Sequence, residues 1–560
     1  MNLNPVWLKS YPEGVPAQID PSLYSSLVGL LEDSFSKFAQ RTAYSFMGRD
    51  FSFAQTDQES LAMAAYWQSL GLSKGDRVAI MMPNVPQYPV AVAAVLRAGL
   101  VVVNVNPLYT ARELEYQLKD AGAKAIVIIE NFAATLDKCI AQTPVQHVVL
   151  AAMGDRLGPL KGSLVNFVVR KLKKLVPDFK LPQAVRFNQA LRVGRQQAFR
   201  KPELLADDIA VLQYTGGTTG VSKGAVLLHR NVIANVLQSE AWNAPVMKRI
   251  PAGQQPTNVC ALPLYHIFAF TVNMMLGLRM GGKTILIPNP RDLPAVLKEL
   301  SQHTFHSFPA VNTLFNGLAH HPDFGRVNWA NLKVSLGGGT AVTPNVAKLW
   351  LEKTGCPICE GYGLSETSPS ASCNPTTSTE FTGTIGLPLP STWMKLLDDD
   401  GHEVTTPGMP GEIAIKGPQV MAGYWQRPDE TAKVMTPDGF FKSGDVGTFD
   451  AAGYFKIVDR KKDMMLVSGF NVYPNEVEEV ASACPGVLEC AAIGVPDEKT
   501  GEAVKLVVVK KDPNLTEAQV LAYCREHLTA YKLPRLIEFR TELPKTPVGK
   551  ILRRALRAPV

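Results

Sequence analysis

The sequence predicts an α/β protein with a large N-terminal domain of mostly parallel sheets covered by helices and a small α+β C-terminal domain. The chain has 560 residues, more than one hydrophobic core usually serves, so at least two domains are expected. From Asp76 onward, apolar strand-like runs alternate with helical patterns, which is typical of parallel sheets covered by helices. After Asp459 the pattern changes to that of a unit of about a hundred residues, a normal domain size.

The expected elements of the large domain follow one another closely. A capping box from Thr110 to Glu113 marks the start of a helix that runs through Lys119. The other elements expected there are strands at Arg77–Met82, Val101–Val105, Ala125–Ile129 and His147–Ala151, and a helix at Gln87–Ala98. In such sheets ligands bind beyond the carboxyl ends of the strands, so functional residues are expected in the loops that follow strands.

The small domain is expected to contain three strands and one helix. They lie at Val487–Val495, Val504–Lys510, Thr516–Leu528 (the helix) and Leu536–Phe539. The charged run from Asp459 to Asp463 suits an exposed hinge. The sequence therefore predicts domains at 1–460 and 461–560, with the hinge near 460–463.

The composition excludes several classes of protein. The chain is 46% hydrophobic and 19% charged, which excludes a largely disordered protein. Its net charge of +7 is too small to indicate nucleic-acid binding, but it suits phosphate-bearing substrates or an anionic membrane surface. We see no secretory signal and no apolar run that could span a bilayer, and the eight cysteines are scattered. We therefore expect a cytoplasmic protein, in which Cys356 and Cys359 are ordinary buried thiols despite their redox-motif spacing.

The strongest local signal is the segment from Tyr214 to Ala225, which directly follows an apolar run. Its glycines allow backbone amides to approach an anion, its hydroxyls add donors, and Lys223 supplies a positive charge. This pattern predicts a cradle for a triphosphate rather than a flexible surface loop. The residues expected to bind the triphosphate are Tyr214, Thr215, Gly216, Gly217, Thr218, Thr219, Gly220, Ser222 and Lys223.

A second segment, Gly277–Thr284, matches the pattern of a different phosphate-binding loop. That motif requires a helix immediately after it. Here an apolar run ended by Pro288 follows, so we interpret the segment as a turn that leads into a strand.

Two further glycine-rich segments, Gly337–Ala341 and Glu360–Thr367, each follow a short apolar run. Tyr362 offers a flat face for a purine base. Glu366 is a hard oxygen ligand suited to Mg²⁺, and the hydroxyls of Ser365 and Thr367 can hold phosphate.

These segments, with Gly444–Asp445, Asp459–Arg460 and Pro544–Lys550, resemble in their order the motifs of the adenylate-forming superfamily. That superfamily contains acyl-CoA synthetases, luciferases and peptide-synthetase adenylation domains. The resemblance extends from about Asp76 to Arg554. Within it, Gly439–Asp445, Asp459–Glu478 and Asn104–Thr110 are very similar to bacterial long-chain fatty acyl-CoA synthetases. Phe440 stands where the family often has Trp, and we expect only a packing effect from it.

The resemblance implies a ligase reaction in two steps. The carboxylate of a fatty acid attacks the α-phosphate of ATP, pyrophosphate leaves, and the acyl-adenylate then passes its acyl group to coenzyme A. ATP and coenzyme A are thus the implied co-substrates, and Mg²⁺ is the implied cofactor. The implied catalytic residues are Lys550, Glu366 and Thr367, and the implied metal ligands are Glu366 and Thr218.

The resemblance also implies roles around the nucleotide. Asp445 would hold the ribose hydroxyls, and Arg460 a ribose or phosphate oxygen. Thr340 and Tyr362 would frame the adenine. The other implied ATP-binding residues in these segments are Gly339, Glu360, Gly361, Gly363 and Ser365. The small domain is implied to be mobile: it would rotate about Lys462 and replace Lys550 with the loop around Gly469, where a glycine leaves room for the pantetheine arm of coenzyme A.

Two features leave alternatives open. His266 lies in a segment that resembles the wall of the family's acid pocket, so it is either close to the carboxylate or a satisfied core histidine. A basic amphipathic helix expected over 164–176 either lies on an anionic membrane or packs on its own domain. Its apolar face would carry Leu164, Val165, Val168, Leu172, Leu175 and Val176, and its charges Arg170, Lys171, Lys173 and Lys174.

Alternative functions also remain at this point. The acid could be a medium-chain or aryl acid, and the enzyme could stop at the adenylate, although no insertion that would restrain the rotation is seen between Gly411 and Pro474. A non-catalytic nucleotide-binding module is disfavoured because Lys550, Glu366 and the whole cradle are present. The sequence leaves open whether the protein forms a homodimer.

Overall fold

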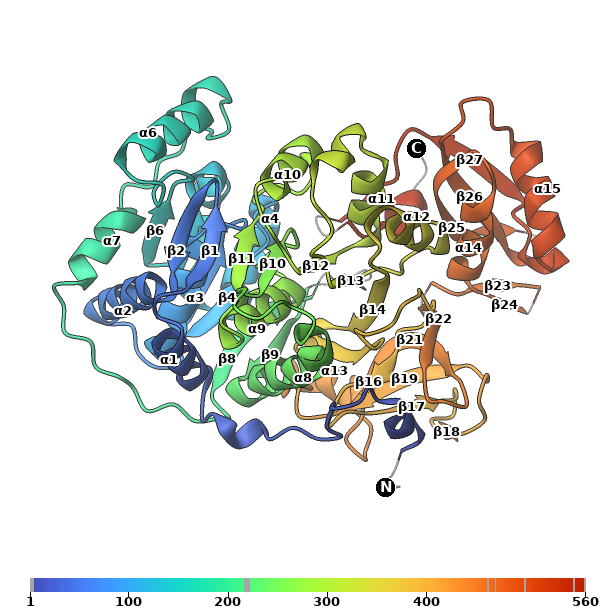
Figure 1. Ribbon diagram of the computed structural model, residues 1–560, viewed down its shortest axis with the longest axis horizontal. Coiled ribbons are helices and arrows are strands. Elements are labelled where there is room, and N and C mark those ends of the chain that lie inside the picture. Colours follow the sequence, from blue (N-terminus) through green and yellow to red (C-terminus); the bar gives the residue numbers. More distant parts are fainter. Residues whose placement is uncertain are drawn as a thin grey trace.

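Two mainly parallel sheets form the large N-terminal part of the protein (Figure 1). The computed structural model describes residues 5–215, 222–460, 463–468, 470–497, 500–546 and 549–557. The first sheet contains, in spatial order, β20 (Gly423–Tyr424), β9 (Gly224–Leu228), β8 (Ile209–Tyr214), β4 (Val101–Asn104), β3 (Arg77–Met81), β5 (Ala123–Ile129), β6 (His147–Ala151) and β7 (Val185–Arg186). The strands from β8 to β7 are all parallel to their neighbours.

The second sheet lies beside the first and shares an apolar core with it. It contains, in order, β16 (Leu387–Pro388), β15 (Ser370–Cys373), β14 (Ile358–Gly363), β13 (Val334–Gly338), β12 (Ser307–Ala310), β10 (Thr257–Cys260), β11 (Lys283–Leu286), β1 (Thr42–Phe46) and β2 (Arg49–Ser52). The strands from β14 to β1 are parallel. The two sheets confirm the predicted α/β class. Strand β11 confirms that the segment ending at Thr284 leads into a strand.

Helices fill the space between the sheets and cover their outer faces. The shared core takes in α1 (Leu27–Lys37), α2 (Phe53–Ser69), α3 (Gln87–Arg97), α7 (Phe187–Gly194), α8 (His229–Met247), α9 (Leu276–Arg279), α10 (Leu293–Leu300), α11 (Asn312–His320) and α12 (Pro344–Thr354). The far face of the first sheet is covered by α4 (Ala111–Ala121) and α5 (Ala133–Asp137). Every residue of α3 is buried, as expected for a helix that is apolar on all sides. The capping box of α4 is present as predicted.

An antiparallel sheet follows the parallel ones, and the sequence pattern did not predict it. It consists of β18 (Glu403–Val404), β17 (Trp393–Leu397), β19 (Gly411–Lys416), β21 (Phe441–Phe449) and β22 (Phe455–Arg460), in that order. A short helix, α13 (Pro428–Val434), lies between β20 and β21 in the chain. Because this sheet places its last strand just before the charged run at 460–463, it leads directly to the expected hinge.

The small domain is built around one long antiparallel pair (Figure 1). Its sheet contains β24 (Phe470–Val472), β23 (Met465–Val467), β26 (Gly501–Lys510) and β25 (Val487–Asp497), with β27 (Leu536–Arg540) parallel to β26. Its helices are α14 (Pro474–Ala483), α15 (Glu517–His527) and α16 (Arg553–Arg557). Most of the apolar residues of this sheet form a core of their own with α14 and α15, which confirms a separate α+β unit.

The expected basic helix over 164–176 differs from the structure. Helix α6 (Pro159–Phe167) begins earlier and continues as a π-helical turn, η5 (Val168–Leu172). The wider turn shifts the helix register, so that Val169 is buried rather than Val168. Arg170 is less exposed than the lysines, because it binds the buried carboxylate of Glu130 at 2.7 Å. Arg186 binds the same carboxylate at 2.9 Å.

Two expectations about composition can be compared with the structure. Within the described ranges, no helix is both long and apolar enough to cross a membrane. All eight cysteines are buried and free, which confirms the interpretation of Cys356 and Cys359 as ordinary thiols.

Candidate active site

A single large cavity brings together most of the residues that the sequence analysis singled out. Its volume is about 2470 Å³, and its walls come from the carboxyl ends of β8, β13 and β14, from α8 and α12, and from the small domain. Ligands are expected at this end of parallel strands. The predicted site residues on the walls are Tyr214, Thr215, Ser222, Lys223, His266, Gly339, Thr340, Glu360, Gly361, Tyr362, Gly363, Ser365, Glu366, Asp445 and Lys550.

The cradle predicted after β8 is described only at its two ends. Gly216, Gly217, Thr218, Thr219 and Gly220 lie outside the described residues. At its base, the Thr215 amide donates to the carbonyl of Lys223 over 2.9 Å, and the Ser222 hydroxyl donates to the carbonyl of Thr215 over 2.5 Å. These bonds fix the point at which the chain leaves β8 and enters β9.

Lys223, the cation of the cradle, has two partners that the sequence did not reveal. Its ammonium lies 2.5 Å from the carboxylate of Glu430 on α13 and 4.9 Å from the centre of the Tyr424 ring on β20. The contacts of Glu430 with Lys223 and Lys433 lower its pKa to about 2. Strand β20 joins the sheet beside β9 although they are far apart in the chain, so no local pattern could have indicated these contacts.

Glu366 lies in the wall of the cavity and is 8% exposed. It accepts a hydrogen bond from the Tyr424 hydroxyl at 2.7 Å, and burial raises its pKa. Next to it in the chain is Thr367, which the sequence analysis predicted as a catalytic residue. It is fully buried, and its hydroxyl accepts from the Leu364 amide and donates to the carbonyl of Pro369, so it shapes the turn that presents Glu366.

The expected adenine end is formed by β13, β14 and the loop after β13. The Tyr362 hydroxyl donates to the carboxylate of Asp445 on β21 at 2.7 Å. Glu360 accepts from the Val342 amide at 2.9 Å, and burial raises its pKa to about 7. The hydroxyl oxygen of Thr340 is buried, and no described residue is its hydrogen-bond partner. A buried hydroxyl of this kind fits a polar ligand in the cavity.

Lys550 reaches this cavity from the small domain. Its side-chain Cε lies 4.0 Å from the position that a Cβ on Gly339 would occupy. Its backbone bonds twice to Thr546, and Gly549 before it has a φ of +82°, a conformation that suits glycine. His266 also lines the cavity. Burial, together with the nearby charge of Lys550, lowers the pKa of His266 to about 4, so the imidazole is neutral at pH 7.

The small domain is held in this position by polar contacts across the boundary. The buried Asp459 carboxylate at the end of β22 accepts from the Asn475 amide at 2.7 Å. The Asn345 side chain on α12 donates to the carbonyl of Ser482 at 3.2 Å. On the small domain, Arg553 pairs with Glu478 at 2.8 Å. Arg460 lies opposite Asp445 in the β21–β22 ladder, but its side chain, and all of Lys462 and Gly469, lie outside the described residues.

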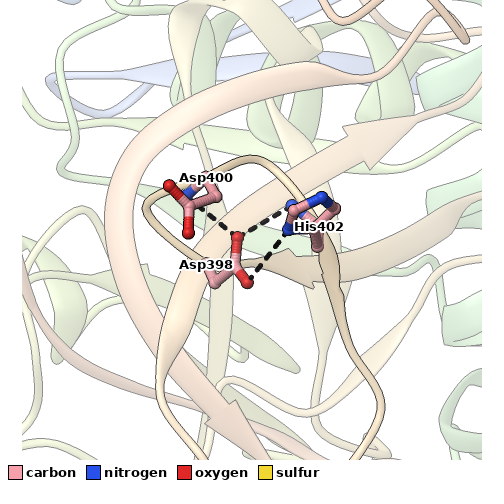
Figure 2. Close-up of side chains that lie close together, drawn as sticks. All are labelled: Asp398, Asp400 and His402. Carbon is pink, nitrogen blue, oxygen red and sulfur yellow. Dashed lines mark hydrogen bonds and ion pairs between the residues drawn. The ribbon is translucent and has the colours of Figure 1, made fainter.

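Of the two expected metal ligands, Glu366 is described and Thr218 lies outside the described residues. A single carboxylate such as Glu366 suits Mg²⁺, which usually completes its coordination with water and substrate phosphates. Among the described residues, one group of three potential ligands occurs, made of Asp398, Asp400 and His402 (Figure 2). This group is exposed in the turn from β17 to β18, where Asp398 accepts from the amides of Asp400 and His402 at 3.0 and 2.8 Å. These bonds account for the turn without a metal.

The whole chain has counterparts among known proteins. The model of the AMP-binding enzyme family matches residues 31–425, and that of its C-terminal domain matches residues 476–550. The chain belongs to the AMP-binding enzyme family. It is similar to the long-chain-fatty-acid–CoA ligases of Escherichia coli O157:H7 (53% identity) and Haemophilus influenzae (49%), with 99% of this chain and 98% of each relative covered.

The fold is also that of solved members of this family. The ATP-bound crystal structure of MatB from Rhodopseudomonas palustris superimposes with a TM-score of 0.80 at 29% identity, covering 95% of this chain and 98% of that one. This likeness confirms a large α/β domain followed by a smaller domain.

Proposed function

We propose that the protein activates a long-chain fatty acid as its acyl-adenylate with ATP and then transfers the acyl group to coenzyme A. The observation that carries the proposal is the cavity, in which a cationic phosphate end, with Lys223 and Lys550, continues into a wall rich in apolar side chains. The full-length similarity to long-chain-fatty-acid–CoA ligases supports the same reaction.

In this proposal the adenylation step depends on charge. Lys223 and Lys550 neutralise the negative charge that develops on the phosphates when pyrophosphate leaves. Glu366 would hold Mg²⁺, with Thr218 of the cradle, and the bound ion would polarise the phosphate oxygens. His266, which is neutral at pH 7, can donate a hydrogen bond to the fatty acid carboxylate without removing its nucleophilic charge. Thr367 supports this site only through the turn that it shapes.

The nucleotide would be held between the two sheets. Asp445 would bind the ribose hydroxyls and Arg460 a ribose or phosphate oxygen, while Tyr362 would stack on the adenine. The buried hydroxyl of Thr340 would find its partner in the nucleotide. Because the Tyr362 hydroxyl already bonds to Asp445, the base and ribose sites are coupled through one hydrogen bond.

The transfer step requires the small domain to move. Lys550 occupies the cavity in this structure, which suits adenylation and leaves the thiol step to another arrangement. We propose the domains 1–460 and 461–560, a hinge at 460–463 with Lys462 as its pivot, and entry of the pantetheine arm past Gly469 after rotation. The contact of Asp459 with Asn475 crosses this boundary, so rotation would have to break it.

The test is release of AMP, measured with and without coenzyme A, across saturated acids from acetate to stearate. The proposal expects CoA-dependent release that is greatest for long acids. A maximum at medium-chain or aryl acids would replace the proposed substrate, and adenylate that forms but is never transferred would indicate an enzyme that stops at the first step. No turnover with any acid would leave the nucleotide-binding module as the function.

We also propose contact with an anionic membrane surface on a cytoplasmic protein. Five large apolar side chains are exposed on and after α6: Leu160 (88%), Leu164 (63%), Phe167 (53%), Leu172 (68%) and Leu175 (52%). Four exposed lysines accompany them, at 161, 171, 173 and 174. Apolar residues flanked by basic ones favour the interface of an anionic bilayer. We call these nine residues the α6 patch.

The membrane contact is tested with vesicles that contain anionic lipid. Replacing Lys171, Lys173 and Lys174 with Gln should weaken binding strongly, since each cation near an anionic surface contributes about 1 kcal/mol. Arg170 is left unchanged because it holds Glu130. Exposed lysines elsewhere, Lys37, Lys298 and Lys348, give a matched triple variant that should bind normally. Equal binding by both variants would refute the α6 patch as the contact. The homodimer stays a prediction for sedimentation analysis.

A further inference from the structure

The first described part of the chain forms a strap over the outside of the large domain. The strap, residues 5–24, contains two short helical turns, η1 (Val6–Ser10) and η2 (Pro21–Leu23). Figure 1 shows it starting beside the antiparallel sheet and running towards α1. On the way, η1 packs on β16 and η2 packs on α8. It therefore joins parts of the fold that are far apart in the sequence.

Several hydrogen bonds fasten the strap. The Tyr11 hydroxyl donates to the carbonyl of Pro388 at 2.5 Å. Around Ser391, the backbone amide donates to the carbonyl of Ala17 at 2.9 Å and the side chain accepts from the Ile19 amide at 2.9 Å. Because these bonds hold the strap to the end of β16 and to the β16–β17 connection, the middle of the strap has a fixed position.

Only one layer of side chains separates the strap from the cavity. The ring of Tyr11 meets the ring of Trp242 edge to face, with centroids 5.1 Å apart and an angle of 85° between the planes. Trp242 lines the cavity with Cys373 and Leu389, and the same three residues form one apolar cluster with Tyr11 and other strap residues. The indole of Trp242 thus stands between the strap and the cavity.

The position of Trp242 is specified on its polar edge as well as on its faces. Its Nε1 donates to the carbonyl of Asn374 at 3.0 Å, and its own carbonyl accepts from the Thr376 hydroxyl at 3.2 Å. The side chain is 2% exposed. A ring that is bonded at one edge and backed by a second aromatic ring is a rigid wall, unlike a flexible aliphatic side chain.

This wall is built by other elements than the groups proposed to bind phosphate. Lys223 and Glu366 are joined through Tyr424 on β20, whereas Trp242 stands on α8 against β15 and β16 in an apolar cluster. Apolar walls suit the hydrocarbon part of the substrate. We propose that Trp242, held in place from behind by Tyr11, closes the acyl part of the cavity and limits the length of the fatty acid that the enzyme accepts.

Trp242 is then a specificity-determining residue and Tyr11 a positioning residue. The inference rests on the proposed fatty acid ligase function. It differs from that function in what it predicts, because it concerns the ratio of activities on acids of different length and not the presence of activity.

The experiment compares kcat/KM for laurate, palmitate, arachidate and behenate in the full-length enzyme. In Trp242→Ala, the ratio of behenate to palmitate should rise at least ~10-fold, a factor that one methylene in a hydrophobic pocket can produce. Since truncation of a buried Trp leaves a cavity and can prevent folding, Trp242→Phe provides a milder variant with a smaller shift in the same direction.

Variants of Tyr11 separate positioning from general loosening of the strap. Tyr11→Ala should raise the ratio of behenate to palmitate activity, because Trp242 loses the ring that packs against it. Tyr11→Phe keeps this ring and should show the wild-type ratio. Ser10→Ala, which removes only the exposed bond to the carbonyl of Ala452, is the matched control and should leave the ratio unchanged.

Each outcome decides one point. An unchanged ratio in folded Trp242→Phe and Tyr11→Ala, with the wild type active on palmitate, would overturn the inference and leave the ligase function standing. Equal shifts in Ser10→Ala and Tyr11→Ala would also overturn the role of Tyr11. No activity of the wild type on any of the four acids would instead refute the proposed function.

Discussion

The buried carboxylate of Glu360 should make the stability of the protein depend on pH near neutrality. Its side chain is 8% exposed. Burial raises its pKa from the usual 4.5 to about 7, and the bond from the Val342 amide and the charge of Lys456 only partly offset this. The folded protein therefore holds the proton more tightly than the unfolded chain does.

The direction of the effect follows from the two pKa values. Below pH 4.5 the carboxyl is protonated in both states, and burial costs no charge. Above about pH 7 it is ionised in both states, and the folded state bears the full cost of the buried charge. Stability should fall as the pH rises between these values. At about 1.36 kcal/mol for each pKa unit, the loss is about 3 kcal/mol.

Glu360→Gln removes the charge and keeps an oxygen that can accept from the Val342 amide. The unfolding free energy of the variant relative to wild type should therefore increase by about 3 kcal/mol between pH 4.5 and about pH 8. Any cost of the added amide group cancels in this comparison of pH values. Since about 1 kcal/mol moves the Tm of a large domain by roughly 2 °C, the expected change is roughly 6 °C.

Scanning calorimetry of the wild type and the variant at both pH values gives the measurement. Glu352→Gln, an exposed position on α12, controls for the loss of a surface charge. If the pH dependence of Tm in Glu360→Gln runs parallel to that of the wild type, Glu360 does not titrate near neutrality and the reasoning from burial is wrong.

Three further predictions concern the reacting groups. Lys550→Ala should slow pyrophosphate release at least ~10²-fold but still transfer a supplied acyl-adenylate to coenzyme A. The exposed control Lys348→Ala should keep both rates. Equal loss in both half-reactions of Lys550→Ala would contradict a role in adenylation alone. Glu366→Ala should abolish the Mg²⁺ dependence of pyrophosphate release and most of its rate. Glu380→Ala, in an exposed loop, should change neither. An unchanged Mg²⁺ titration in Glu366→Ala would exclude Glu366 as the ligand. Glu430→Gln should lower the KM for ATP by up to ~5-fold, the range of an exposed ion pair, because Lys223 then has no carboxylate that competes with phosphate. A raised KM would show that Glu430 orients Lys223 instead.

Much of the fold could be predicted because its signals are local. The apolar runs at β3, β4 and β6, the capping box before α4 and the pattern change after Asp459 each depend on neighbours in the chain. The antiparallel sheet from β17 to β22 lacked such a signal. Its strands alternate imperfectly, and β20 with Tyr424 and the short helix α13 with Glu430 interrupt them in the chain.

The site shows the same limit. Glycine-rich loops and isolated acidic or basic residues could be recognised by type, and the cavity collects most of them. The sequence could not show which side chains contact each other across the fold. The contacts of Lys223 with Glu430, of Glu366 with Tyr424 and of Tyr362 with Asp445 join strands and helices far apart in the chain. The bonds of the Thr367 hydroxyl to the backbone beside it are local, but residue type alone did not indicate them.

The anchor of Arg170 and Arg186 on Glu130 has a mechanical consequence. It fixes the α6 patch rigidly to the large domain, and Figure 1 shows α6 at the opposite end of the molecule from the small domain. A protein adsorbed through this end would leave the small domain, for which we propose a rotation, in open water. The proposed rotation of the small domain between the two half-reactions would then displace water and not lipid. Membrane binding would therefore not hinder turnover.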